Sequence, residues 1–429
     1  MALCVTMLCS QYLCARQMTI GIDDMFRIAD ERNSSIKMYG TKDEAAAEAV
    51  KAAKSQRLPE IGVAASVGYL GNGRIWDRDF GNGSTVAMPH FGNNFSIEAR
   101  QTVYAGGAIR SGIKLAELGK EMAELDYNKN RQEIRFMLVA DLLEICKADN
   151  YAAVLRENIA LAERIIKDMN ARLEQGTALK NDITRYELQK ENLKLQLTQV
   201  LNGRSILNHR LATALHLPDG SEIVPDSAIT TDSMSLPPEN FWHESAKAGN
   251  IDLKQVETSL KIAGQNVKSA RSEMIPHISL FAADHLDGPI TIEVPVLDNN
   301  FNYWSVGISL EYSLSSLFKN NRQLKKAKIE QRQAEEYRQV TKEQVDNAVQ
   351  AGYTDYLTAL SGLETQKKSV ELANENYSII SNRYSNGLAL LTDMLDASNA
   401  KIDAELGLAN ARIAVIYSQY KIKYIVHSL

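Results

Sequence analysis

The chain has 429 residues, of which 24% are charged and 45% are hydrophobic, and its formal net charge is −5. This charge balance gives no basic field of the kind that nucleic-acid binding requires, so nucleic acid is excluded as a partner. The run of lysines and arginines from Lys319 to Lys328 is most simply a solvated helix face. After the N-terminus no apolar segment reaches the length of about 18 residues that a membrane-spanning helix needs, which leaves a membrane β-barrel open.

Residues 1–15 resemble the apolar part of a secretory signal peptide, although they lack a positive start. Cleavage after Ala15 is expected and would leave Cys146 as the one cysteine, which excludes a disulfide within the chain. Lipidation of Cys14 is not expected, because the residues before it do not resemble a lipobox. The other two cysteines of this stretch are Cys4 and Cys9.

The first elements after this leader are helical and then extended. Helix-forming residues from Ile22 to Lys54 predict one helix or a bent helical pair that ends before Pro59. Two strands follow, because residues alternate in polarity or size over Ile61–Tyr69 and over Phe95–Val103. The loop rich in glycine and asparagine between them, residues 71–94, makes the pair a hairpin with a long connection.

A helical pattern of unusual length then runs from Gly107 to Gly176, a span of 69 residues (176 − 107) that corresponds to roughly 100 Å of helix. A shorter helix returns to about Leu215, the proline-rich segment 217–238 is predicted to be irregular, and one further helix is predicted from Asn240 to about Arg271. Apolar residues in the distal part of the long helix are spaced alternately three and four apart, as coiled-coil packing requires: Ala152, Leu155, Ile159, Ala162, Ile166, Met169 and Leu173.

The second half repeats this order. A strand begins near Ile278, and the strand from Trp304 shows the clearest alternation in the chain, with an apolar face that suits lipid. A helical pattern from Phe318 to Gly387 again spans 69 residues (387 − 318), and a final helix is predicted from Leu390 to about Ile425.

Two similar segments end the long helices. RLEQGTALKNDITR stands at 172–185 and RYSNGLALLTDMLD at 383–396, with a constant offset of 211 residues (383 − 172). Each places a glycine where a helix would end in a left-handed conformation, and each starts a second helical pattern at once. We therefore predict a long helical hairpin that is made twice.

Four strands cannot close a barrel, and lipid does not tolerate an open sheet edge. Three copies of the chain would supply twelve strands, an even number within the range of outer-membrane barrels. The same elements would also suit a soluble β-sandwich that carries a coiled-coil stalk.

The order of elements and the segment RYSNGLALLTDMLDAS together resemble the TolC-like outer-membrane efflux channel family. The resemblance implies a mainly α chain with a transmembrane β-barrel part: a homotrimer with a 12-stranded β-barrel in the outer membrane of a Gram-negative bacterium, continued by a periplasmic α-helical barrel. It implies partners as well, namely outer-membrane lipid, a periplasmic adaptor and an inner-membrane transporter of the RND or ABC type, for efflux or type I secretion. The segments are then a signal peptide (1–15), an equatorial segment (16–58), barrel hairpin 1 (59–104), helical hairpin 1 (105–216), an equatorial linker (217–238), a returning helix (239–274), barrel hairpin 2 (275–316) and helical hairpin 2 with the C-terminal segment (317–429).

The resemblance places a gate at the periplasmic tip. Asp393 and Asp396 occupy the positions of the family's aspartate rings, and Asp182 and Tyr384 match a pair that holds the closed state. The threonine usual beside that aspartate is Asn181 here, and the usual arginine is Ala389, so fewer cross-links are expected. The alternative is that both aspartates of the last helix only complement its N-terminal dipole.

The resemblance also places adaptor docking on the exposed tip, although glycine and leucine there would also serve to form the turn. The docking residues are Arg172, Gly176, Ala178, Leu179, Arg383, Gly387, Ala389 and Leu390. On the strands, Glu98, Arg100 and Glu311 are expected to face the pore.

An enzyme and a structural scaffold are two other classes of protein with some of these features. An enzyme is not expected: the glycines at 106, 107 and 112 precede Ile113 where a phosphate loop needs lysine, and the seven histidines are scattered, so neither a metal site nor a cofactor is predicted. A secreted or periplasmic coiled-coil scaffold remains the alternative to a channel.

Overall fold

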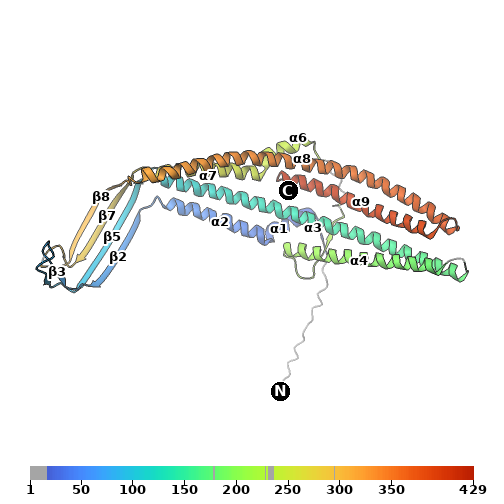
Figure 1. Cartoon of the computed structure of the whole chain (residues 1–429), viewed down its shortest axis with the longest axis horizontal. Coiled ribbons are helices and arrows are strands. Elements are labelled where there is room, and N and C mark those ends of the chain that lie inside the picture. The colour runs from blue at the N-terminus through green and yellow to red at the C-terminus, as the bar shows by residue number, and fades with distance from the viewer. Residues whose placement is uncertain (1–16, 177–178, 228, 230–235, 294) are drawn as a thin grey trace, which may run out of the picture. The chain divides into compact units, whose positions relative to one another are not determined.

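The computed structural model describes residues 17–176, 179–227, 229, 236–293 and 295–429. The predicted signal peptide and the docking residue Ala178 lie outside these ranges. The chain forms two compact units, each built from separate parts of the sequence. The helical unit contains the residues up to Thr41, Leu125–Lys254 and Val340–Leu429, and the sheet unit contains Lys42–Glu124 and Gln255–Gln339. Figure 1 labels the long helices and the four main strands.

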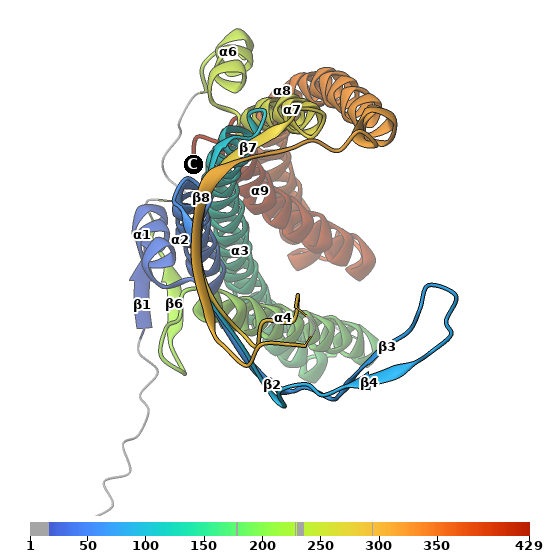
Figure 2. The same cartoon turned by 90° about the vertical axis from the view of Figure 1, so that its left-hand side faces the viewer.

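The sheet unit is built on four antiparallel strands in the order β2-β5-β7-β8, which form one curved sheet (Figure 2). Their bounds are Glu60–Tyr69, Phe91–Tyr104, His277–Gly288 and Phe301–Glu311. The prediction was wrong for the connection 71–94. It contains a small hairpin, β3 (Gly73–Ile75) with β4 (Ser84–Val86), and β5 begins before Asn94 because both its neighbours pair with it there, which overrides the low strand propensity of glycine and asparagine.

The register gives the sheet two different faces. Val63 pairs with Ile97 and Ala282 with Val306, so the apolar positions of all four strands lie on one face. That face is open: Val63 is 78% exposed, and Trp304 and Ile308 are exposed to a similar degree. The other face is mixed: most of its residues are small or polar, but it also carries aromatic rings, and the ring of Phe281 covers Gly307. The predicted alternation on the last strand is confirmed.

The four long helices match the sequence prediction closely. They are α3 (Ala108–Glu174), α4 (Lys180–Ala214), α8 (Ser316–Ser385) and α9 (Leu391–Ile425). Figure 1 shows α3 beside α4 and α8 beside α9 in the helical unit, where the predicted stripe residues Leu155 and Met169 are buried. None of the described helices has an apolar stretch sufficient to span a membrane.

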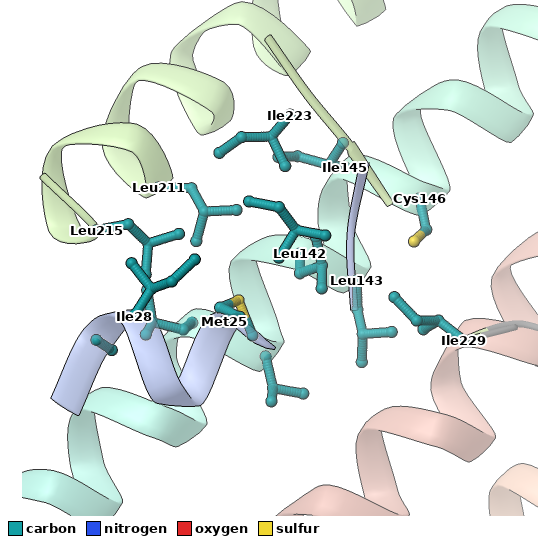
Figure 3. Close-up of a cluster of buried hydrophobic side chains, with 14 of the residues drawn as sticks. Met25, Ile28, Leu142, Leu143, Ile145, Cys146, Leu211, Leu215, Ile223 and Ile229 are labelled. Carbon is teal, nitrogen blue, oxygen red and sulfur yellow. The ribbon is translucent and has the colours of Figure 1, made fainter. Parts of the chain in front are cut away.

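Short elements cover one end of each hairpin in the helical unit. Helix α1 (Ile22–Arg32) packs on α3 and α4, and Figure 3 shows Met25 and Ile28 facing Leu142, Leu211 and Leu215. In the second half, α6 (Glu239–Gly249) packs Trp242 and Ala246 against α8 and α9. The N-terminal strand β1 (Gln17–Ile20) pairs in parallel with β6 (Glu222–Pro225). The segment 217–238 was predicted to be irregular, and the prediction was wrong for the four residues of β6.

An asparagine breaks the helix in both halves. The single helix predicted from Asn240 to Arg271 is in fact α6 and α7 (Ile251–Ser272), separated by Asn250. The side chain of Asn250 accepts a hydrogen bond from the Leu253 N–H (3.1 Å) and donates one to the Ile425 carbonyl (2.8 Å). These bonds cap one helix and attach it to the end of another, which compensates for the interrupted backbone ladder.

Asn33 makes the same contacts between α1 and α2 (Ser34–Ser55). Its side chain accepts hydrogen bonds from the N–H groups of Ser35 (2.9 Å) and Ile36 (3.2 Å) and donates one to the Ala214 carbonyl (2.8 Å). We call the two arrangements the asparagine clasps. The predicted bent helical pair is confirmed, and the duplication extends to these clasps, with an offset of 217 residues (250 − 33).

A histidine ends each returning helix beside its clasp, and the two are again 211 residues apart (427 − 216). His216 and His427 both have positive φ, 50° and 58°. Burial lowers the pKa of His427 below its usual value, against the pull of the neighbouring Asp252 carboxylate.

Each short helix also makes a polar contact with its hairpin, but the acidic residue lies on a different helix in each half. In the first half Arg135 of α3 donates to Asp30 of α1. In the second half Asp346 of α8 contacts His243 of α6, with 2.8 Å between Nδ1 and Oδ1. At the offset of 217 residues Asp30 corresponds to Lys247, and at the offset of 211 residues Arg135 corresponds to Asp346. The pKa of the exposed Lys247 is raised mainly by Glu244 and to a smaller extent by Asp346. The acidic residue is therefore on the short helix in the first half and on the long helix in the second half.

Candidate gate and docking surface at the helical tips

The turn between α8 and α9 is set by one glycine. Gly387 has φ 75°, a conformation that residues with a side chain rarely adopt. The N–H of Gly387 bonds to the Tyr384 carbonyl (3.0 Å) and the N–H of Leu388 to the Arg383 carbonyl (2.8 Å), which is the Schellman pattern. The turn between α3 and α4 starts in the same way, with Gly176 at φ 74° and its N–H 2.9 Å from the Leu173 carbonyl.

All four helices contribute to an apolar cluster next to these turns. Its buried members are Ile166 and Met169 of α3, Ile183 and Tyr186 of α4, and Leu391 and Met394 of α9. Tyr377 and Tyr384 of α8 pack against them. The two tips of one chain are therefore held together by side-chain packing rather than by the turns alone.

Tyr384, one of the predicted gate residues, lies at the edge of this cluster. Burial raises its pKa, the nearby Asp182 carboxylate raises it further, and Arg172 opposes the shift. Tyr384 and Asp182 are thus close enough to interact electrostatically, with the phenol protonated and able to donate. Asp182 is partly buried, whereas Asn181 beside it is exposed.

The predicted gate aspartates of α9 have different local roles. Asp393 accepts a hydrogen bond from the Leu390 N–H, with 3.0 Å between N and Oδ2, and so caps the first turn of α9. Asp396 is exposed one turn further along and has no ion-pair partner among the described residues. Asp393 therefore has a local role in the first turn of α9, as the dipole alternative would allow, and the role of Asp396 stays a prediction.

The described residues that were predicted for adaptor docking form a largely exposed surface with apolar and basic parts. Leu179 and Leu390, which precede the two returning helices, are 68% and 70% exposed. Arg383 is exposed and its Nη2 lies 3.4 Å from the Leu388 carbonyl. Arg172 and Ala389 are partly buried. The leucines present side chains that the turn does not need, because the backbone bonds already hold it.

The three residues expected in the pore belong to the sheet unit and are not part of the tip. Glu98 and Arg100 of β5 lie on the face opposite the apolar one, as does Glu311 at the end of β8. Glu98 lies 4.0 Å from Nε2 of His285 on the neighbouring strand. No group of acidic, histidine or cysteine side chains in the described parts of the chain is arranged to hold a metal ion.

Two residues of the tip were missed from the sequence. Leu388 is 68% exposed beside Leu390 but corresponds to Thr177 in the first repeat, so a comparison of the repeats passes over it. Tyr186 is 1% exposed, and its hydroxyl has no hydrogen-bond partner among the described residues. Its position on α4, three residues after the buried Ile183, is the signal that could have identified it.

Comparison with known proteins agrees with this geometry. The family model described as outer membrane efflux protein matches residues 26–215 and 242–422, which is most of the chain. The chain belongs to this family of outer membrane efflux proteins. Membership confirms the expected place in the outer membrane of a Gram-negative bacterium, with extension into the periplasm, and it confirms the resemblance drawn from the tip motif.

Individual members of the family are distant in sequence but similar in fold. The outer membrane protein TolC of Salmonella enteritidis is 23% identical over 419 residues, covering 92% of this chain and 80% of the relative. The outer membrane efflux protein BepC of Brucella suis is 21% identical, covering 76% and 70%. Among solved structures, the outer-membrane channel OprN has a TM-score of 0.79 at 16% identity, covering 95% of this chain and 90% of that one. VceC of Vibrio cholerae has the same TM-score at 14% identity, covering 95% and 96%.

Proposed function

We propose that this efflux protein is the exit channel of a tripartite system, in which three copies form one conduit. The observation that carries the proposal is the four-stranded sheet, which has an exposed apolar face and two edges, β2 and β8, that are unpaired among the described residues. Joining three such sheets edge to edge would satisfy every strand and turn the apolar face to lipid. Glu98, Arg100 and Glu311 would then line the pore.

The helical hairpins would continue this barrel into the periplasm. A periplasmic adaptor would dock on the tips and connect the channel to an inner-membrane transporter, and Asp393, Asp396, Asp182 and Tyr384 would act at the gate. Support comes from the exposed leucines and from the exposed Asp396 carboxylate, which the fold of one chain does not use. The chain itself carries no catalytic step in this scheme.

The channel is tested with the purified full-length chain in detergent and in planar bilayers. We expect a trimer that converts to monomer on heating, and discrete conductance steps after reconstitution. A monomer that fractionates away from the outer membrane and gives no conductance would contradict the channel and favour the coiled-coil scaffold.

Docking is tested by placing charge on the exposed leucines. Leu388→Asp with Leu390→Asp is expected to weaken capture of the adaptor by at least about a hundredfold, because each leucine buried at an interface contributes about 1.5–3 kcal/mol. Ile292→Asp in the sheet unit, at a residue that is 93% exposed, is the matched control. Undiminished capture by the double variant, with the trimer intact, would mean that the leucines serve only the turn.

A further inference from the structure

Positive charge gathers where the helices of the sheet unit meet the strands. Helix α8 begins at Ser316, shortly after β8 ends at Glu311, and no carboxylate occurs between Glu311 and Glu330. Five exposed basic residues stand in this stretch: Lys319, Arg322, Lys325, Lys326 and Lys328. The chain as a whole is acidic, so this concentration does not follow from composition.

The other three crossings between helix and strand show the same feature. One pair of exposed basic residues precedes β2, one follows β5 and one precedes β7: Lys54 and Arg57, Arg110 and Lys114, Lys268 and Arg271. We call these residues and the five of α8 the basic collar. All of them belong to the sheet unit.

Most of the collar is not neutralised by the chain itself. Among the described residues, Lys114 lies 3.1 Å from Glu117 and Lys326 lies 3.3 Å from Glu330, and no other collar residue has a carboxylate within 4.0 Å. Exposed like charges close together repel one another, so an isolated collar is unfavourable unless an anion lies over it.

Apolar side chains are exposed directly beside these charges. Phe318 is 82% exposed, Leu314 67%, Leu58 65% and Tyr104 49%. They stand at or next to the ends of β2, β5 and β8, where the helices begin. Aromatic and apolar groups next to lysine and arginine are the usual composition of a membrane–water interface.

The spacing along α8 fits one layer of headgroups. At 1.5 Å per residue, Lys319 to Lys326 lie about 5–15 Å from the start of the helix. The headgroup layer of one leaflet is roughly 5–8 Å thick, and the long side chains reach back toward it. Lys319, Arg322 and Lys326 share one face of α8, because they are three and four residues apart.

We propose that the basic collar binds the phosphates of anionic phospholipids in the leaflet on the helix side of the sheet. The inference rests on the proposed function, since it takes the sheet to cross the membrane. The occupant follows from charge complementarity and from the continuity of the collar with the exposed apolar face. The lipid would hold the channel at a fixed depth, with its phosphates countering the collar residues that have no carboxylate within 4.0 Å.

The collar is tested with the full-length trimer reconstituted in phosphatidylcholine bilayers. Electron paramagnetic resonance then measures the association of spin-labelled phosphatidylglycerol relative to spin-labelled phosphatidylcholine. We expect the natural protein to prefer phosphatidylglycerol by about threefold to fivefold, with the preference falling as salt is added. Lys319→Gln, Arg322→Gln, Lys325→Gln and Lys326→Gln together are expected to bring the ratio close to one.

A control variant removes the same number of charges from exposed positions of the helical unit: Lys167→Gln, Lys194→Gln, Lys367→Gln and Lys368→Gln. It is expected to keep the preference. Channel conductance is measured on the same preparations. Lipid binding by the collar is contradicted if the natural channel conducts but does not prefer phosphatidylglycerol, or if the collar variant keeps this preference. A trimer that does not conduct contradicts the proposed function instead.

Discussion

Replacing Asp393 and Asp396 with alanine is expected to raise single-channel conductance in planar bilayers several-fold. In a trimer each aspartate would occur three times around the axis, and rings of carboxylates at a narrow opening hold cations and repel one another. Their removal would lower the charge at the gate and weaken both cation selectivity and block by divalent cations. The measurement is the conductance and the reversal potential of the reconstituted channel.

The alanine at Asp393 also removes a helix cap, so charge and capping must be separated. Asp393 accepts the Leu390 N–H, and loss of such a cap costs about 1 kcal/mol. Asp393→Asn with Asp396→Asn keeps an acceptor and removes both charges. If the asparagine variant conducts like the alanine variant, the charges hold the gate. Conductance unchanged in both would refute the assignment of the gate to these aspartates.

Replacing Arg210 with leucine is expected to destabilise the helical unit by about 2–4 kcal/mol. Asp141 of α3 is 3% exposed and precedes Leu142, which is buried in the cluster beneath α1. Arg210 of α4 donates to both carboxylate oxygens of Asp141. Leaving a buried carboxylate without its partner costs about 3–5 kcal/mol. A somewhat smaller loss is expected here, because the Arg210 side chain is 57% exposed and water can replace part of its interaction with Asp141. The measurement is the thermal unfolding midpoint by far-UV circular dichroism.

Two controls define this effect. Lys194→Leu breaks an exposed pair with Glu191 on the same helix and is expected to change stability by less than about 1 kcal/mol. Arg210→Leu combined with Asp141→Leu removes both charges and is expected to recover most of the loss. A double variant as unstable as the single one would show that packing, and not the unpaired carboxylate, is responsible.

The long elements could be predicted because they are long. Periodicity over many turns fixed the four hairpin helices to within a few residues, and strict alternation fixed the apolar face of the last strand. The repeated glycines predicted both turns, since only a left-handed residue at that position ends one helix and begins the next. Family resemblance added the roles of the aspartates, which no periodicity contains.

The missed features depend on contacts between distant parts of the chain. Strands β1 and β6 have four residues each and pair across about 200 residues, so neither shows a pattern of its own. The helix break at Asn250 depends on the Ile425 carbonyl, which only the folded chain brings near. Leu388 escaped notice because the second repeat differs there from the first.

The acidic residue is on the short helix in the first half and on the long helix in the second, and this difference affects which helix packs on which hairpin. The halves are similar enough that α1 and α6 could each pack on the wrong hairpin. Lys247 corresponds to Asp30 in sequence, so exchange would bring Lys247 toward Arg135 and Asp30 toward Asp346, and like charges repel. The charges of each short helix are therefore complementary to those of its own hairpin. These charges favour packing of each short helix on the hairpin that follows it in the chain, and they disfavour exchange between the two halves.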